Sequence, residues 1–183
     1  QWALESKDGT PYIELSEVIG PRKFALLERT NDETIKNITA LVVYTGALNN
    51  SGEQLVLSYA STTFDSTPSG AWIAGENSSS ANRKTMERLS PKEFGTLETN
   101  WKTWGSIIDF IKNGEDADGN QIFGTPAARN SVNYFSLNDG KDIEENITLP
   151  ADAGYYASTT ILVSASSTLT IKEGVDISLY NGE

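Results

Sequence analysis

The sequence predicts a mainly β protein with an antiparallel, sandwich-like body, one long α-helix at about residues 90–113 and a C-terminal β-meander. The strands are predicted by runs rich in Val, Ile, Tyr and Thr between short polar turns, and by period-two alternation near the C-terminus. The helix is predicted by a capping signal followed by a regular apolar stripe. We expect an extended arm (1–22), a β-rich domain that ends in the helix (23–114), and a meander module (115–183) that can pack with it as one domain.

Four runs before the helix are expected to form strands. A short one, "YIEL", lies in the N-terminal arm, and Val, Ile, Tyr and Thr dominate the other three. Asn50 and Gly52 are turn residues and predict a hairpin between the last two runs. The four runs are residues 12–15, 23–30, 34–46 and 53–62.

The helix is expected to begin at Ser90, followed by Pro91 at the first helical position and by Glu93 three residues after the cap. Gly114 offers a left-handed stop at the other end. Two interpretations of the apolar stripe remain open: it packs on the sheet of its own subunit, or it forms the interface of a homo-oligomer. The stripe has the spacing of a heptad seam and consists of Phe94, Leu97, Trp101, Trp104, Ile108 and Ile111.

Composition excludes several classes of active site. The 183 residues include no Cys, which excludes disulfide scaffolds and thiolate metal sites, and no His, which excludes Ser-His-Asp catalysis and the usual zinc sites. The formal net charge of −11 opposes binding to nucleic-acid phosphates. No apolar run reaches the roughly 18 residues of a membrane span, so we expect no membrane insertion. We also expect no cofactor and no enzymatic activity.

One acidic turn has part of the pattern of a calcium-binding loop. In "EDADGNQI" (115–122), Asp116, Asp118 and Asn120 alternate, and Gly119 permits a sharp turn. The segment fails as an EF-hand, because no Glu stands at the twelfth position of the loop. We interpret it as an Asp-Gly turn and keep the three alternating side chains as weak Ca²⁺ candidates.

Three aromatic side chains are candidates for contact with a glycan. Trp72 lies in a loop-rich segment between Gly70 and Gly75, and Tyr155 and Tyr156 are adjacent to each other before the closing strands. Aromatic rings at the surface offer an apolar face together with a polar group, a combination that suits a sugar.

The closing block alternates apolar and polar residues with a period of two, as a half-buried strand does. Very short turns separate its strands, which indicates an antiparallel meander. A sheet with one apolar face needs another layer or another chain to cover that face. The predicted apolar face consists of Ile161, Val163, Leu169, Ile171, Val175, Ile177 and Leu179.

Residues 145–182, "ENITLPADAGYYASTTILVSASSTLTIKEGVDISLYNG", resemble a C-terminal segment common in tailed-phage fibre proteins and other virion proteins. Two features differ from that pattern: Ser158–Thr160 stands where a Gly-Pro pair is usual, and the usual aromatic closing strand is missing. The shared order is an "ITIP"-like strand (147–150), a small-residue loop (153–154), a "TI-V" strand (161–163), an "LTI-DG" strand (169–174) and a closing strand (175–179).

The resemblance implies a non-enzymatic structural component of a virus particle: a capsid decoration protein, a head fibre or a tail fibre subunit. It implies a homo-oligomer, with a trimer favoured, that docks on capsid or tail proteins in the virion. One alternative is a secreted surface-filament or adhesin subunit of a microbe, outside the cell or on its surface; processing or trimming would explain why the sequence does not begin with Met. The other alternative is a carbohydrate-binding or carbohydrate-cleaving module.

Overall fold

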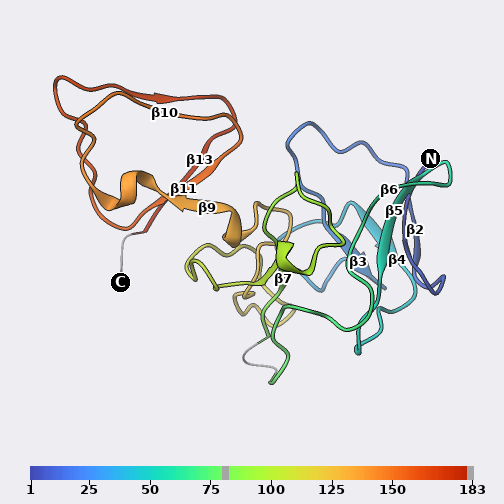
Figure 1. Cartoon of the computed structure of the whole chain (residues 1–183). Helices are drawn as coiled ribbons and strands as arrows, with labels where there is room; N and C mark the ends of the chain where they lie inside the picture. The colour runs from blue at the N-terminus through green and yellow to red at the C-terminus, as the bar shows by residue number, and fades with distance from the viewer. Residues whose placement is uncertain (80–82, 181–183) are drawn as a thin grey trace. The chain divides into compact units, whose positions relative to one another are not determined.

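The computed structural model describes residues 1–79 and 83–180 and divides the chain into two compact units, Gln1–Val132 and Asn133–Glu183 (Figure 1). The segment 115–132, which we expected in the C-terminal module, therefore belongs to the N-terminal unit. Short strands and long irregular connections make up most of the N-terminal unit, whereas the strands of the C-terminal unit are stacked on one another.

The largest sheet of the N-terminal unit is antiparallel and has the strand order β2-β1-β5-β6. The predicted strand at 12–15 is confirmed as β2, and the residues expected to form an extended arm supply two strands of this sheet. The bounds are β1 (Trp2–Ser6), β2 (Tyr12–Leu15), β5 (Leu55–Tyr59) and β6 (Thr62–Ser66).

The hairpin of this sheet does not lie at Asn50–Gly52, because β5 turns into β6 through Ala60 and Ser61. Both turn residues have positive φ, 45° and 68°, as a two-residue hairpin of the mirror-image type requires. Gly52 serves another purpose: a Cβ at this position would stand 2.1 Å from the carbonyl oxygen of Gly70. The absence of a side chain at Gly52 therefore allows its backbone to pack directly against the backbone of the loop at Gly70.

The rest of the N-terminal unit contains two separate strand pairs, so the predicted antiparallel sandwich is wrong. The predicted runs at 23–30 and 34–46 each contain only a three-residue strand, and the other pair lies outside the predicted strand runs. β3 (Leu27–Arg29) and β4 (Val42–Tyr44) are parallel, and β7 (Met86–Arg88) and β8 (Trp101–Thr103) are antiparallel.

The predicted helix at 90–113 is wrong: no described residue lies in an α-helix. Residues 90–97 form turns, η2 (Glu98–Asn100) is a single 3₁₀ turn, and β8 follows it directly. The other short 3₁₀ segments are η3 (Ser131–Asn133) and η4 (Leu137–Gly140).

Tertiary contacts explain why the capping signal does not start a helix. Ser90 Oγ accepts a hydrogen bond from the backbone N–H of Lys92 at 3.2 Å, which closes a local turn. A Cβ on Gly95 would stand 2.4 Å from the carbonyl oxygen of Ser66, so this glycine packs its backbone against the end of β6. Gly105 has φ +77°, a left-handed conformation that interrupts any helix running through it.

The C-terminal unit is a stack of parallel strands, so the predicted antiparallel meander is also wrong. In one sheet β11 lies between β9 and β13, and a second sheet pairs β10 with β12. Ile143 and Val163 add a parallel bridge. The bounds are β9 (Tyr134–Ser136), β10 (Ile147–Leu149), β11 (Gly154–Ala157), β12 (Leu169–Ile171) and β13 (Asp176–Leu179).

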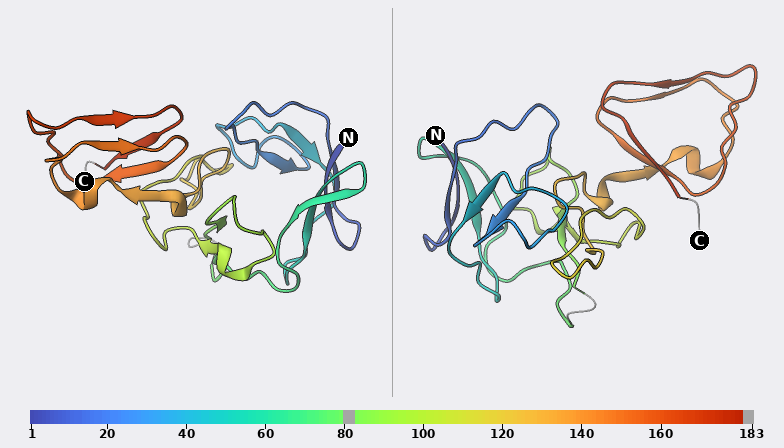
Figure 2. Two further views of the ribbon diagram at one scale, coloured as in Figure 1. Left: turned by 45° about the horizontal axis from the view of Figure 1, so that its top comes forward. Right: turned by 180° about the vertical axis from the view of Figure 1, so that it is seen from behind.

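These pairings define coils that lie on top of one another. Tyr134 pairs with Gly154, 20 residues later, and Gly154 pairs with Asp176, 22 residues later. The chain winds round a three-sided outline in Figure 1, and the left view of Figure 2 shows the strands of successive coils stacked. The unit is a short parallel β-solenoid, an architecture in which each repeat contacts only its neighbours.

Side chains that point into the coils form the core of this unit. Leu137, Leu149 and Ala157 are buried together. The period-two alternation of the closing block thus marks the inner face of successive coil sides and not one face of a flat sheet. The partly buried side chains around the three buried ones are Ile147, Tyr155, Ile161, Leu169, Val175 and Ile177.

One hydrogen bond links the first coil to the third. Tyr134, Gly154 and Asp176 occupy equivalent positions of β9, β11 and β13. Gly154 has no side chain, so the ring of Tyr134 can lie across the middle coil, and its hydroxyl donates to the carboxylate of Asp176.

Candidate functional surfaces

The six residues predicted to form an oligomer interface do not lie on one stripe, because the helix that would align them is not present. Trp104 and Ile108 are buried inside the N-terminal unit, and the indole N–H of Trp104 donates to the carbonyl of Ile111 at 2.8 Å. Trp101 and Ile111 are half-buried. Phe94 and Leu97 are exposed, so these two alone retain the accessibility that a contact with another chain requires.

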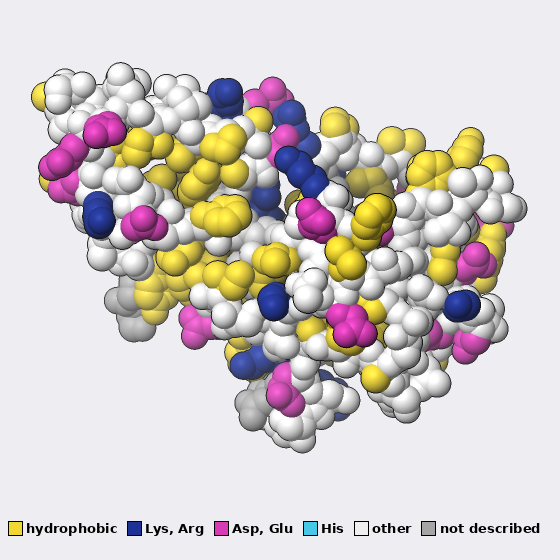
Figure 3. Space-filling model, in the orientation of Figure 1, with side chains coloured by type: hydrophobic (Ala, Val, Ile, Leu, Met, Phe, Trp, Pro, Cys, Tyr) yellow, Lys and Arg dark blue, Asp and Glu magenta, His cyan; other side chains and the backbone are white. Residues whose placement is uncertain are grey.

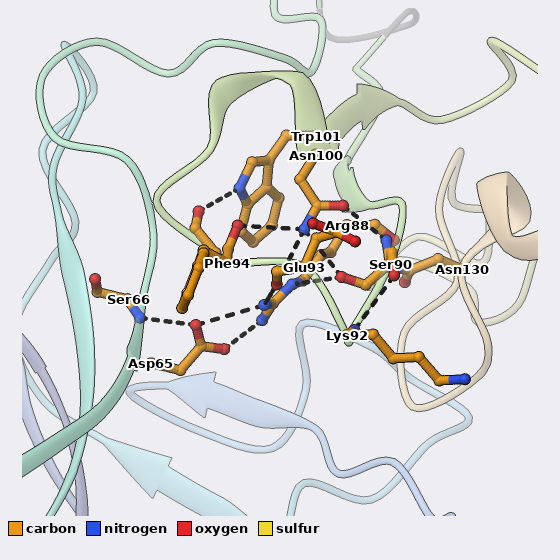
Figure 4. Close-up of polar contacts among 11 residues, drawn as sticks. Asp65, Ser66, Arg88, Ser90, Lys92, Glu93, Phe94, Asn100, Trp101 and Asn130 are labelled. Atoms are coloured by element: carbon orange, nitrogen blue, oxygen red, sulfur yellow. Dashed lines mark hydrogen bonds and ion pairs between the residues drawn. The ribbon is translucent and has the colours of Figure 1, made fainter.

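Arg88 holds the segment that carries Phe94 and Leu97. Its guanidinium forms an ion pair with Asp65 and donates to the carbonyls of Ser90 at 3.1 Å and Glu93 at 2.6 Å (Figure 4). The same group lies 6.0 Å from the centre of the Trp101 ring, within cation–π distance. The planar, multiply donating guanidinium is suited to joining β6 to several carbonyls of one loop.

Asn100 of η2 binds the same loop. Its side-chain oxygen accepts from the N–H of Ser90 at 2.8 Å, and its amide donates to the carbonyl of Ser90 at 2.9 Å. Trp101 donates its indole N–H to the carbonyl of Gly95 at 2.7 Å. Figure 4 shows these side chains converging on the loop from β7, β8 and the end of β6.

The consequence is a fixed loop that presents apolar side chains to solvent. Phe94 is 78% exposed, Leu97 is 43% exposed, and Asn100 beneath them is buried. A loop held by this many side-chain hydrogen bonds does not owe its conformation to packing of Phe94. The exposed ring is therefore available to a partner without cost to the fold.

The Asp116 loop is held by its own hydrogen bonds. Asp116 Oδ1 accepts from the backbone N–H groups of Asp118 at 3.0 Å and Asn120 at 2.8 Å. Hydrogen bonds from the backbone and side chain of Asn120 lower the pKa of the Asp116 carboxyl. Within residues 1–79 and 83–180, no group of three or more Asp or Glu side chains is placed to hold a metal ion. The segment forms an Asp-centred turn in the structure.

Three buried glutamates use their carboxylates to bind loops. Glu28 accepts a hydrogen bond from the N–H of Ile35 at 2.7 Å. Glu53 accepts one from the N–H of Asn49 at 2.9 Å and one from the hydroxyl of Ser6. Glu87 accepts hydrogen bonds from two hydroxyl groups. The donors to Glu87 are Thr125 Oγ1 at 2.8 Å and Ser131 Oγ at 2.6 Å. These carboxylates accept hydrogen bonds from donor groups of the loops, so their role in the structure is to hold the loops in place.

The three predicted glycan contacts lie in two different units. Trp72 is half-buried in the N-terminal unit, and its indole N–H donates to the carbonyl of Asn49 at 2.9 Å. Tyr155 packs against the core of the solenoid, and Tyr156 beside it is half-buried. The more exposed aromatic side chains lie elsewhere, at Tyr12, Phe24, Phe64, Phe94 and Phe135.

The solenoid exposes inward-pointing residues at both ends of its stack. Phe135 of β9 occupies the position equivalent to the core residue Tyr155 and is 63% exposed. At the other end Leu179 lies over Ala157 and is 71% exposed, and Ile171 lies over Leu149 and is exposed too. The apolar interior thus continues to both faces of the stack, where no further described strand covers it.

Within the part of the chain that the structure describes, no helix has the length and hydropathy that a membrane span requires. Comparisons of this chain with protein-family models, with curated proteins and with solved structures found no match.

Proposed function

We propose that this chain is a non-enzymatic structural component of a virus particle, of the decoration, head-fibre or tail-fibre kind, and that it assembles through contacts between subunits. The observation that carries the proposal is the order of strands and turns in residues 145–182, which resembles the C-terminal segment of tailed-phage virion proteins. This segment supplies β10, β11, β12 and β13, most of the strands of the solenoid.

The ends of the solenoid support assembly. Repeat proteins of this kind need polar caps to remain soluble alone, because each coil buries its apolar face only against the next coil. Here Phe135, Ile171 and Leu179 occupy the end layers and are exposed. The outer edges of β9 and β13 also carry backbone groups that another strand can pair with, as sheet edges do in assemblies.

The loop around Phe94 supports a second contact. Its conformation is set by Arg88 and Asn100, so a partner that receives the Phe94 ring does not need to order the loop first. A preformed contact of this kind loses less conformational entropy on binding.

Two measurements test the proposal. Mass spectrometry of particles purified from a lysate of the host that carries the gene should find peptides of this chain in amounts comparable to known structural proteins. Light scattering of the purified chain should give a multiple of the chain mass, with a trimer expected. Absence from the particles would contradict the virion assignment, and a monomer at all concentrations would contradict assembly of the chain by itself.

A variant pair locates the contact. Leu179→Asp places a charge in the exposed end layer of the solenoid and should reduce the measured mass to that of a monomer. Ile107→Asp, at an aliphatic residue that is 49% exposed in the N-terminal unit, is the matched control and should leave the mass unchanged. Equal effects of the two variants would contradict assembly through the solenoid.

A further inference from the structure

A cluster of exposed aromatic rings lies on one face of the four-stranded sheet. Trp2 of β1 stands directly opposite Tyr59 of β5, and residues that stand opposite each other share one face of an antiparallel sheet. The ring of Trp2 lies 5.2 Å from that of Tyr59 and 4.8 Å from that of Phe64, between centres. Phe64 shares this face because it lies two residues after Thr62, which stands opposite Tyr59, and alternate residues of a strand point to the same face.

The three rings are accessible. Trp2 is 39% exposed, Tyr59 46% and Phe64 59%. The other three tryptophans differ from Trp2: each donates its indole N–H to a backbone carbonyl within the fold and is less exposed. In the region of this sheet, Figure 3 shows hydrophobic side chains at the surface with acidic side chains beside them.

A hollow lies beside Trp2 and combines an apolar floor with a polar rim. Leu15, which stands opposite Trp2 on β2, and Leu57 of β5 line it together with Val18. Gln1 and Glu17 contribute polar groups to the same hollow.

The rim is both hydrogen-bonding and acidic. Gln1, whose side-chain amide donates to the Glu14 carboxylate at 3.2 Å, lines the hollow, and Glu17 adds a carboxylate there. Amide and carboxylate side chains can accept and donate hydrogen bonds with neighbouring hydroxyl groups of one ligand. The carboxylate also repels an anionic ligand.

We propose that this surface, defined by Trp2, Tyr59, Phe64 and the adjacent hollow, binds a neutral oligosaccharide built of hexopyranose units. A pyranose ring has one face of C–H groups that packs on an indole or phenyl ring, and hydroxyl groups around its edge that need polar partners. Tilted aromatic rings beside a carboxylate–amide rim provide both. The Glu17 carboxylate favours a neutral sugar over sialic or uronic acids, and the polar rim favours a hydroxyl-rich ligand over an aliphatic peptide, which would leave the rim without hydrogen bonds.

This inference stands apart from the proposed function, because a filament subunit or a free binding module can use the same surface. Its failure would leave the virion proposal standing, and absence of the chain from virus particles would leave the glycan site standing.

The test is saturation-transfer NMR and tryptophan-fluorescence titration of the full chain. The probes are maltohexaose, cellohexaose, chitohexaose and galacto-oligosaccharides, with sialyllactose as the anionic probe. We expect at least one neutral probe to bind, with saturation transferred mainly to the protons of one ring face. Trp2→Ala and Phe64→Ala should each weaken that binding at least tenfold, and Trp2→Phe should retain part of it.

Tyr12→Ala is the matched control, since Tyr12 is 56% exposed on the same sheet but pairs with Glu5 on the opposite face. It should leave the affinity unchanged, with circular dichroism showing that every variant folds. Three outcomes would overturn the proposal: no neutral probe binds, sialyllactose binds more tightly than all of them, or folded Trp2→Ala and Phe64→Ala bind as well as the unchanged chain. Self-association of the chain that Trp2→Ala abolishes, with no glycan binding, would assign the surface to a second copy.

Discussion

In the N-terminal unit, hydrogen bonds from side chains fix much of the backbone that regular secondary structure leaves unpaired. Strands of three to five residues leave many N–H and C=O groups outside any ladder, and buried groups of this kind need partners. Asn100 bonds both the N–H and the carbonyl of Ser90, and Glu28 binds the N–H groups of Thr34 and Ile35. Polar residues that the sequence alone would place at the surface therefore stabilise the fold through these hydrogen bonds.

The first residue-scale prediction concerns Gly95, which is buried and packs its backbone on Ser66. Gly95→Ala should lower the free energy of unfolding by about 1–3 kcal/mol, because the new Cβ would stand 2.4 Å from a backbone oxygen that cannot move freely. Urea denaturation measures the change. Gly20→Ala is the control: its Cβ would make an ordinary 3.5 Å contact with Lys23, so stability should stay the same or rise slightly. Equal effects would show that the 89–100 loop is not packed as described.

The second concerns the carboxyl of Asp116, whose hydrogen bonds from Asn120 favour its charged form. Its pKa in the folded chain should lie below the ordinary value of an aspartate, as a carboxyl ¹³C NMR titration would show. Since the folded pKa is the lower one, the stabilising contribution is complete above the unfolded pKa and is lost as pH falls through the folded pKa. Asn120→Ala removes the side-chain hydrogen bond but keeps the backbone N–H, so the pKa should rise only part of the way toward the ordinary value. A wild-type pKa at or above that value would contradict the loop geometry.

At the scale of elements, the sequence predicts which residues form strands better than it predicts how strands pair. Several observed strands fall within predicted runs: β2, β3, β4, β5, β12 and β13. Alternation of apolar and polar residues indicates which side of a strand is buried. A strand in a flat sheet and a strand in a solenoid coil both bury one side, so the alternation does not distinguish them. The turn "KEG" (172–174) is short enough for a hairpin, yet it forms a corner between β12 and β13.

The helix was wrong for a different reason. Ser90, Pro91 and Glu93 have the local chemistry of a helix start, but contacts distant in sequence decide the conformation: Arg88 with Asp65, and Gly95 with Ser66. Intrinsic helix preference amounts to less than about 1 kcal/mol per residue and is readily overridden. The heptad spacing is thus a coincidence, because the stripe combines the buried Trp104 and Ile108 with two half-buried and two exposed residues.

The aromatic surface was missed because residues 1–22 were expected to form an arm. Only the pairing of β1 with β5 places Trp2 opposite Tyr59, and the pairing of Tyr59 with Thr62 puts Phe64, two residues further along β6, on the same face. The visible signal in the sequence is a strand-like aromatic and β-branched run at 62–66, "TTFDS", which overlaps the end of the run at 53–62.

An element-scale prediction tests the link between coils. Tyr134→Phe removes the hydroxyl that donates to Asp176 and should lower the free energy of unfolding of the solenoid by about 1 kcal/mol, since Asp176 is exposed and regains water. Asp176→Ala should have a similar effect. The double variant should cost less than the sum of the two, because both remove the same hydrogen bond. Additive effects in this cycle would contradict a direct bond across the middle coil.

At the scale of the whole molecule, the chain consists of two units with different sources of order. The N-terminal unit depends on side-chain hydrogen bonds to loops, and the solenoid depends on an apolar interior and on strand pairing between coils. Residues 133–183 carry 8 acidic and 2 basic side chains, so this unit has a net charge of −6 of the chain's −11. Copies that meet through the solenoid must therefore bring like charges together, and their association should strengthen as salt screens the charges.

The last prediction follows from this division. Leu149→Ala deletes a buried side chain of the solenoid core and should lower the stability of that unit by about 2–5 kcal/mol. Hydrogen exchange monitored by mass spectrometry should show faster exchange in β9–β13 and unchanged exchange in β1, β2, β5 and β6. Thr148→Ala, at the exposed neighbouring position of β10, is the control and should leave both units unchanged. Faster exchange throughout the chain in Leu149→Ala would mean that the two units unfold as one cooperative body, because a cavity in one unit is felt in the other only when their unfolding is coupled.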